Sequence, residues 1–186
     1  MSEGLESGLR RISEFLAELD RPAAIIGGIA VIARVGTRAT RDVDVVLAAG
    51  RADVDRVLEV ATRHGYGFDP NDRELFEEGL IRMWPLAEGP NGFGADLIFA
   101  DAPFLHRVVS RATPMNLAGV ELPIAQLEDL VVMKLEAGRA VDIEDVLAIR
   151  DAFSATLALE QVREEARQLD LLDRVDLYFG APPPET

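Results

Sequence analysis

Two aspartates, Asp42 and Asp44, stand one residue apart in a run that is otherwise apolar up to Leu47. Residues two apart in an extended strand point to the same face, about 6.6 Å from each other. Two carboxylates held side by side repel each other unless a cation lies between them. A hard divalent ion such as Mg²⁺ prefers oxygen ligands and suits such a pair. The spacing therefore predicts a divalent-metal site.

A Gly-Gly pair, Gly27 and Gly28, comes before these acids, between a short apolar run and a predicted helix. Glycine lets the backbone approach a ligand closely, and helix N-terminal amides attract anions. Amides that attract phosphate, next to carboxylates that hold a metal, are typical of a nucleoside triphosphate site. Each motif alone is more often structural, because Gly-Gly turns are common and Asp-Val-Asp-Val can line an edge strand. Their order within one strand–turn–helix–strand unit favours the functional interpretation.

The composition limits the classes of protein to which the chain can belong. Its 186 residues fit one domain, or one domain with a helical appendage. The net charge of -14, from 33 acids against 19 Lys and Arg, argues against a protein that coats nucleic acid or a membrane surface. No cysteine is present, which excludes disulfides and thiolate metal sites. No apolar stretch reaches about 18 residues, so we expect a soluble, cytoplasmic protein with no membrane partner.

The hydrophobic pattern predicts an α/β (α+β) fold with a small mixed β-sheet core, flanking helices and a C-terminal helical segment. We expect a core domain over 1–122, packed C-terminal helices over 123–180 and a disordered tail over 181–186. The segment 104–112 fits a helix or a strand. The expected helices cover residues 9–19, 29–35, 51–64, 124–137, 140–153 and 157–170, and the expected strands cover 21–26, 42–50, 79–86, 93–100 and a small hairpin at 115–123.

The stretch GGIAVIARVGTRATRDVDVV, residues 27–46, resembles the signature of the DNA polymerase β superfamily of nucleotidyltransferases. In that superfamily a Gly-Gly or Gly-Ser turn precedes a short helix and a strand with Asp-x-Asp. With Arg38 and Thr40 just before Asp42, the stretch is most similar to the minimal bacterial members, which include AbiEii-like and toxin–antitoxin proteins. The resemblance covers about residues 23–150. Many members have Ser where this chain has Gly28, so we expect backbone amides to meet the phosphates here.

The resemblance implies a third carboxylate on a neighbouring strand, and Asp96 in FGADLIFA matches it best. The alternative is a strand-end aspartate; Asp101 and Asp69 are poorer matches because both precede turn-like sequences. A lysine on a later helix contacts the nucleotide phosphates in such proteins, and Lys134 matches it. Lys134 shares a stripe with Leu127, Leu130 and Val131, so its stem runs along the inward face.

The next segment, GRAVDIED, carries further charged candidates. Asp142, with Asp145 three residues later, fits an N-cap and a first-turn acid of the following helix. The resemblance places Arg139 and Asp145 in a second polar cluster near the active site, and neither interpretation is favoured for them. Arg38 and Arg41 both flank the Asp-x-Asp and could bind phosphate; the resemblance favours Arg38.

The resemblance implies a metal-dependent nucleotidyltransferase that moves an NMP from an NTP to an acceptor hydroxyl and releases pyrophosphate. The acceptor is RNA such as tRNA, a protein or a small molecule. Asp42, Asp44 and Asp96 hold Mg²⁺ or Mn²⁺, and Gly27, Gly28, Arg38 and Lys134 bind the nucleotide. The chain could be the toxin of a toxin–antitoxin system, with a cognate partner. The alternatives are a non-catalytic nucleotide- or partner-binding module, such as an antitoxin-like component, and an acidic domain with solvated aspartates.

Overall fold

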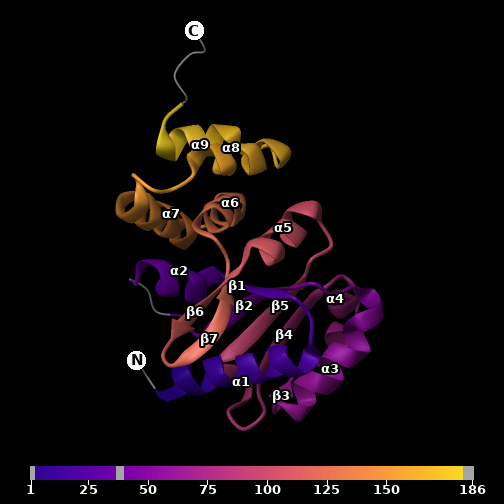
Figure 1. Cartoon of the computed structure of the whole chain (residues 1–186). Helices are drawn as coiled ribbons and strands as arrows, with labels where there is room; N and C mark the ends of the chain where they lie inside the picture. Colours follow the sequence, from indigo (N-terminus) through magenta and orange to yellow (C-terminus); the bar gives the residue numbers. More distant parts are fainter. Residues whose placement is uncertain (1–2, 37–39, 182–186) are drawn as a thin grey trace. The chain divides into compact units, whose positions relative to one another are not determined.

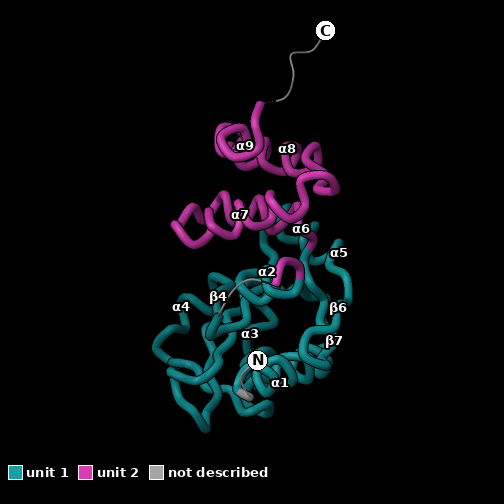
Figure 2. The backbone as a smooth tube through the Cα atoms, turned by 90° about the vertical axis from the view of Figure 1, so that its left-hand side faces the viewer, with its two compact units in different colours: residues 1–33, 37–125 teal, residues 34–36, 126–186 magenta. Residues whose placement is uncertain are grey.

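The structure is a computed structural model that describes residues 3–36 and 40–181 of the chain. The chain divides into two compact units (Figure 2): unit 1 comprises residues 1–33 and 37–125, and unit 2 comprises 34–36 and 126–186. The main division thus falls after Ala125, three residues beyond the expected boundary. No described helix combines the length and the apolar character that a membrane span requires.

Unit 1 is built on one mixed sheet with the strand order β3-β4-β5-β2-β1-β7-β6 (Figure 1). The pairs β2–β5 and β1–β7 are parallel, and the other neighbours are antiparallel. The strands are β1 (Ala23–Ile26), β2 (Asp42–Leu47), β3 (Tyr66–Gly67), β4 (Leu80–Pro85), β5 (Gly94–Phe99), β6 (Thr113–Leu117) and β7 (Val120–Ile124). The predicted mixed α/β fold is confirmed.

Five helices accompany this sheet in the described part of unit 1: α1 (Glu3–Leu19), α2 (Gly27–Val35), α3 (Val54–Arg63), α4 (Arg73–Glu77) and α5 (Pro103–Arg111). Helices α1 and α3 lie side by side, as Figure 1 shows. The ambiguous segment 104–112 is mostly helix α5. Proline at the first position favours a helix start, and Phe104, Val108 and Val109 are buried on one face of the helix.

The central strands alternate between a buried and an open face, as period-two patterns require. Along β2, the side chains of Val43, Val45 and Leu47 are fully buried, whereas Asp42 and Asp44 are partly exposed. Strand β5 follows the same rule, with Ala95, Leu97 and Phe99 buried. Because β2 lies between β5 and β1, the edge-strand interpretation of the Asp-Val-Asp-Val run is wrong.

Unit 2 contains α6 (Leu127–Ala137), α7 (Ala140–Phe153), α8 (Leu159–Gln168) and α9 (Leu172–Phe179). The first three were predicted from their apolar periodicity, whereas α9 was missed, as were the short elements β3 and α4. Helix α6 ends at Gly138, whose left-handed backbone (φ 63°) makes the usual glycine C-cap. Arg174 of α9 donates to the carbonyl of Leu135, one of the last carbonyls of α6.

Candidate active site

Three aspartates meet on the open face of the sheet in unit 1. Strands β2 and β5 pair in parallel, with Asp44 in register with Asp96 and Asp42 in register with Gly94. The three carboxylates share this face because their neighbours Val43, Val45, Ala95 and Leu97 point into the core. The sequence predicted these three acids as one cluster, and the structure places them on adjacent strands. Their catalytic role remains a prediction.

Neighbouring residues restrict the side chains of Asp42 and Asp44. The hydroxyl of Thr40 donates to Asp42 Oδ1 at 2.9 Å, which fixes the orientation of that carboxylate. Gly27, the first residue of α2, has φ 61°, and a Cβ built on it would lie 1.8 Å from Asp44 Oδ2. The N-terminus of α2 therefore lies directly against the Asp44 carboxylate, and only glycine fits there.

Replacing Gly27 by Ala should destabilise the protein more than the same change at another positive-φ glycine. Gly65→Ala is the matched control, since Gly65 has φ 73° and nothing lies within 4 Å of the place that its methyl group would take. Both variants carry the backbone strain of about 1 kcal/mol, and only Gly27→Ala adds the clash with Asp44. We expect urea denaturation to show a loss at least about 1 kcal/mol larger for Gly27→Ala. Equal losses would contradict the close approach of α2 to Asp44.

Arg82 of β4 belongs to this cluster and was not predicted from the sequence. It lies opposite Asp96 in the β4–β5 register and forms a bidentate ion pair with it, Nε to Oδ1 at 2.9 Å and Nη2 to Oδ2 at 2.6 Å. The hydrogen bond to Asp96 and the charges of Asp96, Asp42 and Asp44 raise the pKa of Arg82, against a smaller opposite effect of burial. The alternation in LIRMWP, with Arg82 on an exposed position, was the only sequence signal available.

A cavity of about 350 Å³ adjoins these side chains in unit 1. Asp42, Asp96, Arg41, Arg82 and Trp84 are among the residues that line it. Its size lies in the range of small-molecule pockets. Two arginines therefore line the same cavity as two of the three acids.

Of the two arginines that flank the Asp-x-Asp, only Arg41 can be placed. It is exposed and lines the 350 Å³ cavity, and its backbone carbonyl accepts a hydrogen bond from the Gly94 amide at 3.2 Å. Arg38, which the resemblance favoured, lies outside the described residues. A phosphate-binding role for Arg38 therefore stays a prediction, and Arg41 is the flanking arginine that lines the cavity with Asp42.

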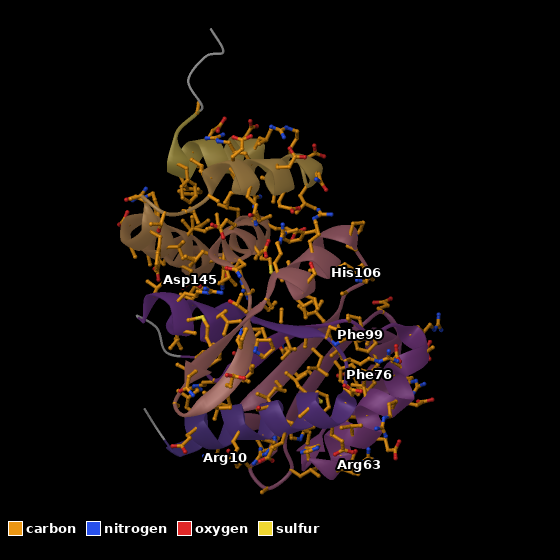
Figure 3. The ribbon with its side chains drawn as sticks, viewed as in Figure 1. Arg10, Arg63, Phe76, Phe99, His106 and Asp145 are labelled. Atoms are coloured by element: carbon orange, nitrogen blue, oxygen red, sulfur yellow. The ribbon has the colours of Figure 1, made fainter. Side chains whose placement is uncertain are left out.

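A larger hollow of about 780 Å³ lies at the other end of strands β2 and β5. Its lining includes Gly50, Asp53, Phe99, Asp101 and His106; Figure 3 labels Phe99 and His106. Of the predicted site residues that the structure describes, none lines this hollow. Because the carboxylate cluster sits at the beginning of both strands, size alone does not mark the candidate site.

Lys134, the only lysine in the chain, lies in a buried ion network within unit 2. Its Nζ is 2.9 Å from Asp142 Oδ1 and 2.9 Å from Asp145 Oδ2. Lys134 and Asp145 are 5% exposed and Asp142 is fully buried; Figure 3 labels Asp145 on α7. The inward-facing stem predicted for Lys134 is observed. The nucleotide contact that the resemblance implies for Lys134 remains a prediction.

Asp142 is not the N-cap that the sequence suggested, so that prediction is wrong. Helix α7 begins at Ala140 with Arg139 as its N-cap residue, which places Asp142 in the first turn. The Asp142 side chain instead accepts hydrogen bonds from Lys134 and from Arg139, whose Nε lies 2.5 Å from Oδ2. Arg139 and Asp145 thus both take part in this network, Arg139 with a side chain that is mostly exposed. Their proximity to the active site stays a prediction.

Asp142 should make the stability of the protein sensitive to acid. Burial by itself raises the pKa of this carboxyl, but the hydrogen bonds and charges of Arg139 and Lys134 outweigh burial and leave the pKa below its ordinary value. A lowered folded-state pKa contributes stability above the unfolded pKa of about 3.9, and this stability is lost as the pH falls through the folded pKa. Thermal unfolding between pH 7 and pH 2 should therefore show a smaller acid-induced decrease for Asp142→Asn than for wild type. Parallel decreases would contradict this coupling.

The carboxylate cluster suits a metal shared with a substrate. No group of three or more His, Asp or Glu side chains among the described residues has the arrangement of a metal cage. Mg²⁺ is usually bound by one or two carboxylates together with substrate phosphates, and not by an all-protein cage. Asp42 and Asp44 supply two such oxygen ligands on one face of β2, and the N-terminus of α2 lies against Asp44 at Gly27. The donor set therefore fits Mg²⁺ or Mn²⁺ held against a phosphate ligand.

Comparison with known proteins identifies the fold. No protein-family model and no curated protein sequence matches the chain. Among solved structures, the chain is similar to the antibiotic-resistance factor ANT(2'')-Ia (TM-score 0.60, 15% identity, 94% of this chain and 98% of that chain). It is also similar to an antigenic nucleotidyltransferase-like protein from Paracoccidioides brasiliensis (TM-score 0.57, 16% identity, 95% and 94% covered). A third similar structure is the lincosamide antibiotic adenylyltransferase LnuA with bound lincomycin (TM-score 0.55, 13% identity, 81% and 97% covered).

These likenesses extend over most of this chain and nearly all of each similar chain. The shared architecture is a mixed α/β structure. At identities below 20%, similarity of structure establishes the fold and leaves the activity to be argued from the site. The chain therefore has the nucleotidyltransferase fold.

Proposed function

We propose that the protein is a metal-dependent nucleotidyltransferase that moves an NMP from an NTP to an acceptor hydroxyl. The observation that carries the proposal is the register of β2 and β5, which puts Asp44 beside Asp96 on the face that also bears Asp42. The N-terminus of α2 lies against the Asp44 carboxylate at Gly27. A site for a metal, a phosphate and a reacting hydroxyl needs these elements in one place.

Each group of this cluster has a proposed role in the reaction. Asp42, Asp44 and Asp96 would hold the divalent ion, and the amides at Gly27 and Gly28 would face the phosphates. Asp96 takes the proton of the acceptor hydroxyl as its oxygen forms a bond to the α-phosphorus. The bond between the α-phosphorus and the bridging oxygen breaks in line, and pyrophosphate leaves with that electron pair. A bound Mg²⁺ would neutralise triphosphate charge and stabilise the attacking and leaving oxygens.

The proposed nucleotide contacts beyond this cluster rest on the sequence resemblance. They comprise Arg38, which lies outside the described residues, and Lys134. The resemblance adds Arg139 and Asp145 as members of a second polar cluster near the active site. Arg41 joins the proposed nucleotide contacts, because it is exposed and lines the cavity next to Asp42. A guanidinium group there can pair with a phosphate through two parallel hydrogen bonds.

The acceptor class is proposed at the level of a hydroxyl on RNA, a protein or a small molecule. ANT(2'')-Ia is also known in complex with adenylyl-2''-tobramycin, and LnuA with lincomycin, so two proteins of similar fold bind antibiotics. The toxin–antitoxin setting rests on the resemblance of residues 27–46. Expression that arrests growth for wild type and not for Asp42→Ala/Asp44→Ala would support that setting, and growth equal to an empty vector would contradict it.

The enzymatic proposal is tested by following which phosphate of a labelled NTP is transferred to the acceptor. The protein is incubated with Mg²⁺ and each NTP, labelled at either the α- or the γ-phosphate, with tRNA, a protein mixture and an antibiotic panel as acceptors. Transfer of α-label with release of γ-labelled pyrophosphate is expected for wild type and not for Asp42→Ala/Asp44→Ala. Identical behaviour of the two proteins with every acceptor would contradict catalysis. Transfer of γ-label would indicate a phosphotransferase instead.

A further inference from the structure

The Asp96 carboxylate forms an ion pair with Arg82 of the same unit. Both guanidinium contacts of Arg82, at 2.9 and 2.6 Å, go to different oxygens of this carboxylate. A bidentate pair of this kind is among the stronger charged hydrogen bonds in proteins. It occupies directions from which Asp96 would meet a divalent ion or take a proton.

The β4–β5 pairing puts Arg82 in this position. Arg82 is directly opposite Asp96, and Met83 is opposite Ala95. A Cβ at Gly94 would come within 2.7 Å of the Met83 carbonyl oxygen, so the two strands approach more closely there than a side chain would allow. Arg82 therefore reaches Asp96 across a tightly paired region of the sheet, from a position that the fold determines.

Arg82 covers the carboxylate from the solvent side. Its side chain is 71% exposed, whereas that of Asp96 is 14% exposed. The guanidinium can thus leave Asp96 without opening the core. It also lines the 350 Å³ cavity together with Arg41, where an anionic group could receive it.

Arg82 also balances the charge of the whole cluster. Arg82 lines the same cavity as Asp42 and Asp96, and Asp44 is in register with Asp96 on the neighbouring strand. Three carboxylates on adjacent strands repel one another unless a positive charge accompanies them. Arg82 supplies a positive charge next to these acids.

We propose that Arg82 is a built-in counter-ion that competes with the divalent cation for Asp96 and transfers to a phosphate of the substrate when the cation binds. The inference rests on the proposed function, since it takes Asp42, Asp44 and Asp96 as the metal-binding acids. Its consequence is an ordered loading of the site: free metal binds weakly, and a triphosphate, by accepting the guanidinium, strengthens metal binding at Asp96.

The test measures Mn²⁺ binding by calorimetry, with no acceptor and no turnover. Arg82→Gln should bind Mn²⁺ about tenfold more tightly than wild type, because a positive charge next to the site is removed and Asp96 is released. Arg82→Lys, which keeps the charge but not the bidentate pair, should lie between the two. A non-hydrolysable NTP analogue should reduce the difference between wild type and Arg82→Gln.

The control is Arg73→Gln, which removes another exposed arginine of unit 1 that pairs with two acids, Asp55 and Glu77. Its Mn²⁺ affinity should equal that of wild type. Circular dichroism checks folding, and Arg82→Lys keeps the test decisive if Arg82→Gln does not fold. An Arg82→Gln effect that disappears in an Asp96→Asn background supports competition at Asp96, and an effect that persists there overturns it.

The remaining outcomes separate this inference from the proposed function. Equal or weaker Mn²⁺ binding by Arg82→Gln overturns the role of Arg82, whereas the proposed function still stands if Asp42→Asn/Asp44→Asn abolishes binding. Wild-type binding by Asp42→Asn/Asp44→Asn contradicts the metal site of the proposed function. Binding by Arg82→Gln and not by wild type supports competition in its strongest form. Binding by neither protein, even with the NTP analogue present, overturns both proposals.

Discussion

Asp44→Asn should lower the rate of nucleotidyl transfer by about a hundredfold to a thousandfold while the protein stays folded. The Asn side chain has nearly the same shape, so the contact with Gly27 and the packing of β2 are retained. What is lost is one negative charge and one anionic oxygen at the proposed metal site, where removing a single stabilising group typically costs 10²–10³-fold in kcat, as an order of magnitude. The measurement is single-turnover transfer of α-label from a saturating NTP.

Asp101→Asn is the matched control for this change. Asp101 lies two residues beyond β5, at the opposite end of the strand from the carboxylate cluster, and lines the 780 Å³ hollow. Its substitution removes the same charge from the same unit and should leave the transfer rate within about twofold of wild type. If Asp101→Asn reduced the rate as much as Asp44→Asn, overall charge and not the cluster would account for the loss.

Lys134→Met should lower the free energy of unfolding by about 3–5 kcal/mol, the largest stability effect that we expect. The variant keeps the apolar stem and removes the ammonium that lies 2.9 Å from both Asp142 and Asp145. These acids are almost completely buried, and removing one partner of a buried ion network leaves charge that the interior cannot solvate. Urea denaturation monitored by circular dichroism gives the measurement.

Arg167→Met provides the comparison within unit 2. Arg167 pairs with Glu164 on α8, and both side chains are more than half exposed, so its loss should cost less than about 1 kcal/mol. Equal costs for the two variants would contradict a structural role of the buried network. Calorimetry with an NTP analogue tests the other predicted role, because a nucleotide contact of Lys134 should also appear as weaker binding by folded Lys134→Met.

Because Lys134 is the only lysine, its burial can also be tested by chemical modification. An amine-selective reagent has a single side-chain target in this chain, and the 5% exposure of Lys134 should make its modification slow in the native protein. Urea should raise the rate of Lys134 modification over the same concentration range in which it unfolds the protein. Asp145→Asn would speed labelling if the ion network holds the ammonium in place.

The local pattern was sufficient to predict the elements and residues that depend on near neighbours along the chain. The Asp-x-Asp spacing placed Asp42 and Asp44 on one face of a strand, and Gly27-Gly28 marked the strand-to-helix turn. Both follow from the two-residue period of a strand and the backbone freedom of glycine, which are properties of short segments. Helix α9 was missed because it has only eight residues and its sequence has no clear helix-start signal.

Only the tertiary structure showed which residues from distant segments lie together. Asp96 was expected as the third acid through a resemblance, but its register with Asp44 depends on the parallel pairing of β2 and β5, which is not a property of either strand alone. Arg82 entered the cluster only because β4 pairs with β5 at that register. Asp142, which looked like a helix cap, proved to be a partner of Lys134. Long-range strand register and buried charge pairing arise from packing of the whole unit, whereas periodicity and turn chemistry act within a few residues.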